Sequence, residues 1–236
     1  MNSNYKKWPL GKLSKNMQRP EFDLLHESGY KWDDPFDVIS LFETKIANYV
    51  NCKYAIAVDN CTDAIFLCLE YLKNSGAINI NKHIEFPVKC YVSIPMMAKH
   101  CGFKIRFVVK KWSGIYQLGN TQIWDSAGRF TKEMYIKGSY QCLSFQIKKR
   151  LPIGKGGMIL TDDHKAMEWF KLARYEGRDL SYDYTEQDYK IIGWNMYMTP
   201  EDAARGILIM DQLPLENEDT HNDLNYPDLS NQKIFK

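Results

Sequence analysis

Three kinds of polar group stand at places in this sequence where ligands are commonly bound. Lys149 lies in a polar run shortly before the glycine pair Gly156-Gly157. Asp125 ends a short apolar stretch that is predicted to be a strand, and the polar turn Asn60 to Asp63 opens a predicted helix. A reactive amine, a strand-end carboxylate and a helix N-terminus that can hold a phosphate are what a protein must supply to use pyridoxal phosphate (PLP).

The lysine and the aspartate have separate tasks in this chemistry. The aldehyde of PLP requires a lysine that forms a Schiff base and later moves a proton. Lys149 is the candidate, although spacing alone leaves Lys148 and Lys155 open. The ring nitrogen requires a carboxylate that keeps it protonated, which Asp125 could supply. Taken singly, a lysine in such a cluster is usually a solvated surface residue, and a strand-end aspartate is usually a turn residue.

The phosphate and the ring face of PLP need further contacts. Backbone amides around Cys61 and the hydroxyl of Thr62 could hold the phosphate, and Ser144, at the end of another predicted strand, could add a second hydroxyl. Tyr91 follows a proline-led segment and could lie against the ring. Asn60 or Thr62 could also be an ordinary helix cap, which is the commoner role of such residues.

The pattern between residues 36 and 213 predicts an α/β domain in which these groups would meet. Apolar runs predict strands at 54–58, 83–88, 104–109, 114–118, 121–124, 140–145 and 157–161. Apolar periodicity and capping residues predict helices at 34–50, 63–73, 92–100 and 163–175, and another that begins at Thr199. The alternation indicates a three-layer α/β/α architecture around a mainly parallel mixed sheet, where ligands lie at the carboxyl ends of strands.

The two ends of the chain lack this pattern. Residues 1–35 are polar and aromatic with little periodicity, and we expect an N-terminal arm or an irregular entry segment there. Residues 214–236 follow Pro214 and resemble a polar C-terminal tail. The expected division is therefore an arm over 1–35, a PLP-binding large domain over 36–213 and a tail over 214–236.

Composition excludes several other classes of protein. The 236 residues are 44% hydrophobic and 25% charged, with a net charge of +2 and no basic block, which argues against nucleic acid binding. The apolar runs are far shorter than a membrane span, and the N-terminus leads to no apolar signal region. The six cysteines form no Cys-x-x-Cys pair, so we expect reduced thiols, no metal site and a cytoplasmic protein.

The order and spacing of the candidate residues resemble those of the DegT/StrS sugar-nucleotide aminotransferases, which are fold-type-I PLP enzymes. The family's Ser-Gly-Thr-Asp-Ala corresponds to Asn60 to Ala64, and its proline-led aromatic segment corresponds to Pro87 to Ser93. Its Asp-x-Ala corresponds to Asp125 to Ala127. Its Ser-Phe-x-x-x-Lys with a following glycine pair corresponds to Ser144 to Gly157, which singles out Lys149 among the neighbouring lysines.

A further motif, later in the sequence, bears on how many copies of the chain assemble. The family's Gly-x-Asn-x-x-Met, followed by two alanines, corresponds to Gly193 to Met198 and Ala203-Ala204, and the similarity runs from about Phe42 to Leu213. In the family this asparagine reaches the phosphate of the other subunit's cofactor, so the resemblance implies a homodimer with shared sites. The catalytic residues that it implies are Lys149 and Asp125. The cofactor-binding residues that it implies are Cys61, Thr62, Tyr91, Asp125, Ala127, Ser144, Lys149 and Asn195.

The resemblance implies an aminotransferase that passes an amino group, by analogy from glutamate, to a keto-sugar nucleotide for surface polysaccharide or related amino-sugar synthesis. The chain departs from the family in having Cys61 where glycine is usual, and Gly128 where a glutamine or histidine contacts the cofactor. The stretch between Val109 and Asp125 is shorter than usual, and the chain ends where the family's small domain would begin, so we expect a short form without that domain.

Other functions remain open at this level. A non-transaminating binding or regulatory protein could keep the fold, the dimer and the cofactor pocket. Sugar dehydration is disfavoured, because that branch of the family replaces the lysine with histidine and this chain keeps Lys149. An unrelated nucleotide-binding α/β protein would need a glycine-rich loop after the first strand, and residues 59–62 do not form one.

Overall fold

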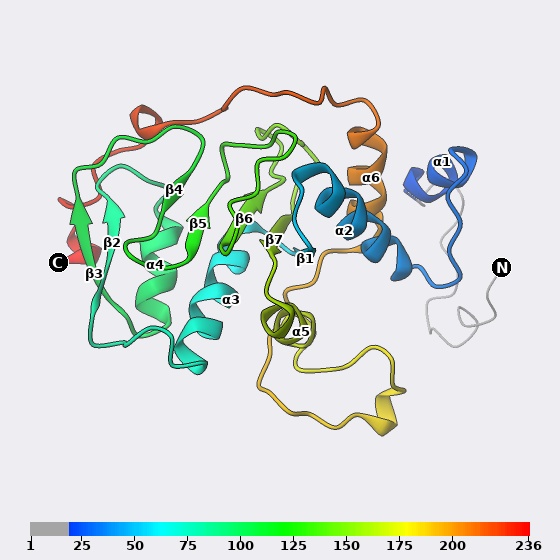
Figure 1. Cartoon of the computed structure of the whole chain (residues 1–236), viewed down its shortest axis with the longest axis horizontal. Helices are drawn as coiled ribbons and strands as arrows, with labels where there is room; N and C mark the ends of the chain where they lie inside the picture. Colours follow the sequence, from blue (N-terminus) through cyan, green and yellow to red (C-terminus); the bar gives the residue numbers. More distant parts are fainter. Residues whose placement is uncertain (1–18) are drawn as a thin grey trace.

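The computed structural model describes residues 19–236, in which a mixed sheet lies between two layers of helices (Figure 1). In spatial order the strands are β1 (Tyr54–Val58), β7 (Gly157–Thr161), β6 (Tyr140–Ser144), β5 (Ile123–Asp125) and β4 (Tyr116–Gln117). A separate parallel pair consists of β2 (His83–Pro87) and β3 (Lys104–Val108).

The pairing in this sheet follows from how its strands are connected. β5 and β6 are parallel, whereas β1–β7, β6–β7 and β4–β5 are antiparallel. The expected α/β class with a mixed sheet is confirmed, but more pairs are antiparallel than the alternation of strands and helices predicts. Short connections over 118–122 and 145–156 contain no helix, so β5 and β7 return alongside the strands that precede them.

Helices cover both faces of the sheet. One layer contains α1 (Glu21–Glu27), α2 (Asp37–Val50) and α6 (Pro200–Met210), and the other contains α3 (Cys61–Asn74), α4 (Ser93–His100) and α5 (His164–Ala173). Short 3₁₀ turns occur at η3 (Tyr184–Glu186), η4 (Asp223–Asn225) and η5 (Lys233–Phe235). Side chains of β1 alternate between the layers: Ile56 and Val58 pack with α3, and Ala55 and Ala57 pack with α2. This alternation confirms the three-layer arrangement.

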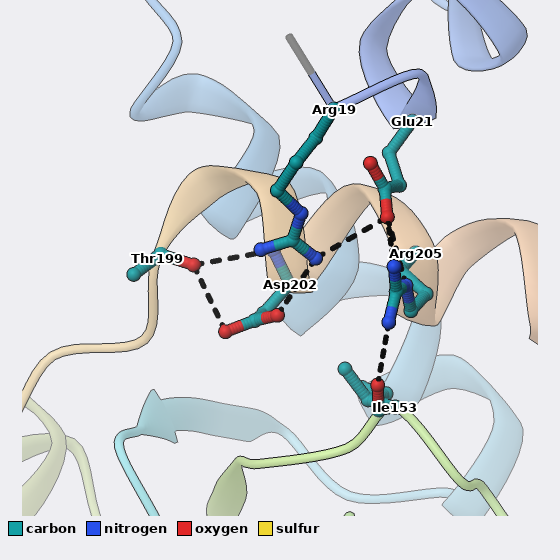
Figure 2. Close-up of polar contacts among 6 residues, drawn as sticks. All are labelled: Arg19, Glu21, Ile153, Thr199, Asp202 and Arg205. Atoms are coloured by element: carbon teal, nitrogen blue, oxygen red, sulfur yellow. Dashed lines mark hydrogen bonds and ion pairs between the residues drawn. The ribbon is translucent and has the colours of Figure 1, made fainter. Parts of the chain in front are cut away.

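The predicted strands and helices between residues 36 and 213 are all present, with ends that differ by a few residues. α1 lies within the segment expected to be an N-terminal arm or an irregular entry segment, so residues 21–27 are regular, while the arm itself stays a prediction. This helix is too short to give a periodic pattern, and contacts with α6 hold it in place (Figure 2). Residues 1–18 of the predicted arm lie outside the described residues.

Residues 214–236, which we call the C-terminal segment, return from α6 along one edge of the sheet to β2 and β3 (Figure 1). Leu229 is buried there, and its amide donates to the Val88 carbonyl at 2.8 Å. The segment therefore packs against the domain over much of its length. The division at residues 35 and 213 stays a prediction.

Residues 19–236 lack two features that would point to other kinds of protein. In this part of the chain, no helix has the length and apolar character needed to cross a membrane. Across the same residues, no three His, Cys, Asp or Glu side chains are grouped so that they could hold a metal ion.

Candidate active site

A cavity of about 600 Å³ opens at the edge of the sheet where β1, β5 and β6 end. These three strands run in the same direction, because β1 and β6 are both antiparallel to β7 and β5 is parallel to β6. The predicted site residues that line the cavity are Cys61, Thr62, Tyr91, Asp125, Ala127, Ser144 and Lys149. The topology therefore brings together groups that are far apart in the sequence, at the edge where α/β sheets bind ligands.

The N-terminus of α3 forms the polar end of this cavity. Asn60 is the N-cap, and its side chain accepts a hydrogen bond from the Asp63 amide at 2.9 Å. Thr62 Oγ1 lies 2.8 Å from Ser93 Oγ, so two hydroxyls stand side by side. A Cβ on Gly157 would lie 2.4 Å from the Asn60 carbonyl carbon, so glycine is what lets β7 approach this turn so closely. Asn60 thus has its ordinary capping role, at a helix N-terminus that faces a cavity.

Asp125 is a buried carboxylate with both oxygens hydrogen-bonded. The Tyr116 hydroxyl donates to Oδ2 at 2.7 Å, and the Ala127 amide donates to Oδ1 at 2.9 Å. Burial raises the pKa of Asp125, while the bonds from Ala127 and Tyr116 and the charge of Lys149 act in the opposite direction. Tyr116 was missed by the sequence reasoning. Pairing the strands predicted at 114–118 and 121–124 as a hairpin would have placed it opposite Asp125.

Lys149 lies on the loop between β6 and β7. It is half-buried, whereas Lys148 and Lys155 are exposed, and Lys155 forms an ion pair with Asp59 at 2.8 Å. Burial lowers the pKa of Lys149, although the negative charge of Asp125 acts to raise it. Of the three lysines left open by spacing, Lys149 is the one whose amine is both shielded from water and electrostatically coupled to Asp125.

The aromatic side of the cavity contains residues that the sequence reasoning did not find. Tyr91 is 55% exposed, and its ring meets the Tyr226 ring edge-on at 6.3 Å. Trp112, Asn225 and Tyr226 also line the cavity. The last two belong to the C-terminal segment, which the sequence suggested was a tail. No sequence pattern links a polar segment of this kind to a site formed about a hundred residues earlier (Figure 1).

Asn195 does not line the cavity of its own chain. Its side-chain amide donates to the Glu176 carboxylate, and its backbone pairs with Tyr175. It stands at the base of a loop over residues 176–195, the yellow segment that projects from the domain in Figure 1. The structure therefore separates this residue from the others that the resemblance assigned to the cofactor.

The chemistry of the lining groups fits PLP. A helix N-terminus with the hydroxyls of Thr62 and Ser144 suits a phosphate, a buried carboxylate suits a ring nitrogen, and a shielded amine suits an aldehyde. Asp125 and Lys149 face the same cavity, as one small aromatic ligand would require.

Comparison with protein families identifies the chain. Residues 25–110 and 130–226 match the DegT/DnrJ/EryC1/StrS aminotransferase family, and the chain belongs to this family. The aminotransferases of this family are PLP-dependent. No curated protein is significantly similar to the chain in sequence.

Solved structures share the fold at low sequence identity. AtS13 from Actinomadura melliaura has a TM-score of 0.67 and 18% identity, and the match covers 86% of this chain and 67% of AtS13. Helicobacter pylori PseC, an aminotransferase involved in pseudoaminic acid biosynthesis, has a TM-score of 0.62 and 17% identity, covering 83% and 63%. The sugar aminotransferase CalS13 from Micromonospora echinospora has a TM-score of 0.63 and 12% identity, covering 81% and 64%. The chain thus spans about two thirds of the length of these proteins, and the likeness establishes the fold.

Proposed function

We propose that this chain is a PLP-dependent aminotransferase that carries its cofactor on Lys149 and passes an amino group from glutamate to a keto-sugar nucleotide. The observation that carries the proposal is the pairing of a half-buried Lys149 with a buried, doubly hydrogen-bonded Asp125 at one cavity. Membership in the DegT/DnrJ/EryC1/StrS aminotransferase family supports it.

Lys149 and Asp125 have separate tasks in this proposal. Bound PLP supplies an aldehyde that combines with amines and a ring that withdraws electrons. Lys149 would hold the cofactor through its aldehyde, since burial favours the neutral form of this amine, and its Nζ would carry a proton. Asp125 holds the proton on the ring nitrogen, because a carboxylate beside that nitrogen favours its charged form.

The remaining residues hold and orient the cofactor. Thr62, Ser144 and the backbone amides at Cys61 bind the phosphate at the positive end of α3. Tyr91 lines the cavity and would offer an aromatic face to the ring, and Ala127 lines the cavity beside Asp125. These assignments give the phosphate, the aldehyde and the ring nitrogen of PLP a partner from this chain.

The sugar-nucleotide substrate is supported by relatives and by charge. The fold neighbours include proteins described as sugar aminotransferases, and PseC acts in pseudoaminic acid biosynthesis. Exposed Lys148 and Lys155 line the same cavity, where they would attract the diphosphate of a nucleotide sugar. A product for surface polysaccharide or related amino-sugar synthesis follows from this substrate class.

A PLP titration tests the proposal. We expect adding PLP to the purified chain to produce the absorbance band of a lysine-bound cofactor, and borohydride to fix PLP on the peptide that contains Lys149. Lys149→Ala should abolish both signals, because no other shielded amine faces the cavity among residues 19–236. Lys148→Ala and the exposed Lys165→Ala should keep them. Labelling that persists in Lys149→Ala would refute the assignment.

Gly128 favours a second candidate function, that of a PLP-binding protein without turnover. It lines the cavity but has no side chain with which to contact the cofactor. Incubating the PLP-loaded protein with glutamate separates the two functions. Conversion of the bound cofactor to its amine form supports the aminotransferase, whereas a stable spectrum with every donor tried supports the binding protein.

A homodimer with shared sites completes the proposal. Asn195 lies outside the cavity of its own chain, at the base of the projecting loop, so contact with a cofactor requires a second copy. Large side chains on this loop are exposed, among them Leu180, Tyr182, Tyr184, Tyr189 and Ile192. Exposed apolar groups gathered on one segment are typical of an interface between proteins.

A further inference from the structure

The C-terminal segment contributes a histidine to the wall of the cavity. His221 lines the cavity together with Asn225 and Tyr226 of the same segment. These residues lie within the range 130–226 that matches the family, and none of the tasks proposed above uses them. Of these three residues, His221 has the side chain best suited to a role in the site's chemistry, because imidazole can donate a hydrogen bond, accept one and transfer protons.

Contacts of His221 and of the two residues before it fix its position. Arg129 donates two hydrogen bonds of 2.8 Å to the carboxylate of Asp219, which also accepts one from the Ser113 hydroxyl at 3.1 Å. The Thr220 amide donates to the Gly128 carbonyl at 2.8 Å. The Gly114 amide donates to the carbonyl of His221 itself at 2.8 Å. One ion pair and two backbone hydrogen bonds therefore hold the C-terminal segment firmly at this point.

Gly128 provides the space that His221 uses. A Cβ at position 128 would lie 3.2 Å from the Cβ of His221 and 3.0 Å from the Cα of Gly114. A larger side chain there would push the segment away. The position at which the family resemblance expects a cofactor-contacting side chain is therefore empty, and the side chain of His221 begins immediately beside it.

The surroundings favour the neutral form of this imidazole and leave one nitrogen available. Nδ1 lies 2.8 Å from the Thr220 hydroxyl, and within residues 19–236 Nε2 has no hydrogen-bond partner. Burial lowers the pKa of His221, and the positive charges of Lys149 and Lys148 lower it further. A neutral imidazole near Lys149 can offer Nε2 to a ligand as a hydrogen-bond donor or acceptor.

We propose that His221 is a cofactor-contacting residue of the active site, supplied by the C-terminal segment in place of the side chain that Gly128 lacks. Its Nε2 hydrogen-bonds a polar substituent of the aromatic ligand bound at Lys149. The inference rests on the proposed function, since it requires PLP in this cavity. It also removes the main argument for a protein without turnover, because the contact absent at position 128 is restored from elsewhere in the chain.

Chemical protection of the histidine tests the contact directly. The full chain is treated with diethyl pyrocarbonate with and without PLP, and modification of each histidine is measured by mass spectrometry. We expect PLP to slow modification of His221 several-fold and to leave the exposed His164 unchanged. Equal modification of His221 with and without PLP would overturn the inference.

Variants supply an independent readout. His221→Ala should weaken PLP binding by about 2- to 10-fold, which corresponds to one hydrogen bond, and His221→Gln should recover most of this loss. Asp219→Asn should weaken binding as well, because it loosens the anchor of the segment although Asp219 does not line the cavity. His164→Ala is the matched control, and a thermal melt of each variant checks folding. Unchanged affinity in a folded His221→Ala would contradict the proposal.

The borohydride labelling of Lys149 separates the two proposals. Labelling at Lys149 without protection of His221 refutes the contact and keeps the proposed function. Absence of labelling at Lys149 refutes both. Labelling together with protection of His221 supports both.

Discussion

Two oppositely charged side chains at one cavity, Lys149 and Asp125, alter each other's ionisation. Burial opposes the charged form of each, and the opposite charge of the neighbour favours it. For Lys149 the effect of burial is the larger, so the pKa of its ammonium is lowered. An amine of this kind attacks carbonyl carbon at a pH where exposed lysines remain protonated.

This electrostatic coupling predicts how the rate of chemical modification of the Lys149 amine depends on pH. The modification rate of Lys149 by acetic anhydride should rise at a lower pH than that of lysine in a short model peptide, because the pKa of Lys149 is lowered by burial. In Asp125→Asn the rise should move to still lower pH, since the carboxylate that favours the ammonium is gone. Competitive labelling across a pH series, read by mass spectrometry, measures both shifts. A midpoint for Lys149 that matches the model peptide would mean that the amine is solvated.

At the residue scale, the sequence predicted the groups that belong to recognisable local patterns. Lys149, Asp125 and Thr62 stand in short motifs, and each lines the cavity. Tyr116 and His221 do not stand in such motifs, because what makes them relevant is a strand register and a distant docking contact. Such relationships depend on tertiary packing between residues far apart in the sequence, and this packing leaves no pattern among neighbouring residues.

At the element scale, α1 is a helix that its own sequence does not predict. It has seven residues, and isolated helices of that length are unstable in water. Glu21 holds it against the domain: Arg205 Nε donates to its carboxylate at 2.8 Å, and Arg19 links the same carboxylate to Asp202 of α6 (Figure 2). Leu25, a residue of α1 itself, is fully buried against the domain. Periodicity predicted the longer helices because each buries a continuous apolar face, and α1 lacks the length for that signal.

Glu21→Gln should destabilise the fold by about 1–3 kcal/mol at neutral pH, since it weakens charge-assisted bonds to partly exposed arginines. Burial acts to raise the pKa of Glu21, but the bonds from its own backbone amide, Arg205 and Arg19 outweigh it and the pKa is lowered. A lowered carboxyl pKa stabilises the fold above the unfolded value, near 4.5, and this contribution disappears as pH falls through the folded value.

Urea unfolding at several pH values measures this contribution. The difference between the wild-type chain and Glu21→Gln should be full at pH 7 and should shrink as the pH falls below about 4.5. Glu27→Gln, an exposed substitution in the same helix, should change stability little at any pH. A difference that is the same at every pH would show that packing, not the carboxylate charge, anchors α1.

At the scale of the whole molecule, two segments distant in sequence determine what the cavity can do. The C-terminal segment closes one side of it with His221 and Tyr226, whereas the loop over 176–195 projects away from it and exposes apolar side chains. Ile192 is 87% exposed and Tyr184 is 73% exposed, and exposure of such apolar surface to water does not stabilise a monomer. Since Asn195 lies at the base of this loop, a second copy that covers the loop would also bring Asn195 toward another cavity.

Sedimentation of wild-type and variant chains tests this arrangement. We expect the wild-type chain to sediment as a dimer and Ile192→Asp to shift it toward monomer, because a buried charge without a partner weakens an apolar interface. Val109→Asp is the matched control, since Val109 is 91% exposed at the end of β3, away from the loop. Ile192→Asp should also weaken PLP binding if Asn195 completes the partner's site, and Asn195→Ala should weaken it without changing the dimer. A wild-type monomer that binds PLP with unchanged affinity in Asn195→Ala would place the complete site within one chain.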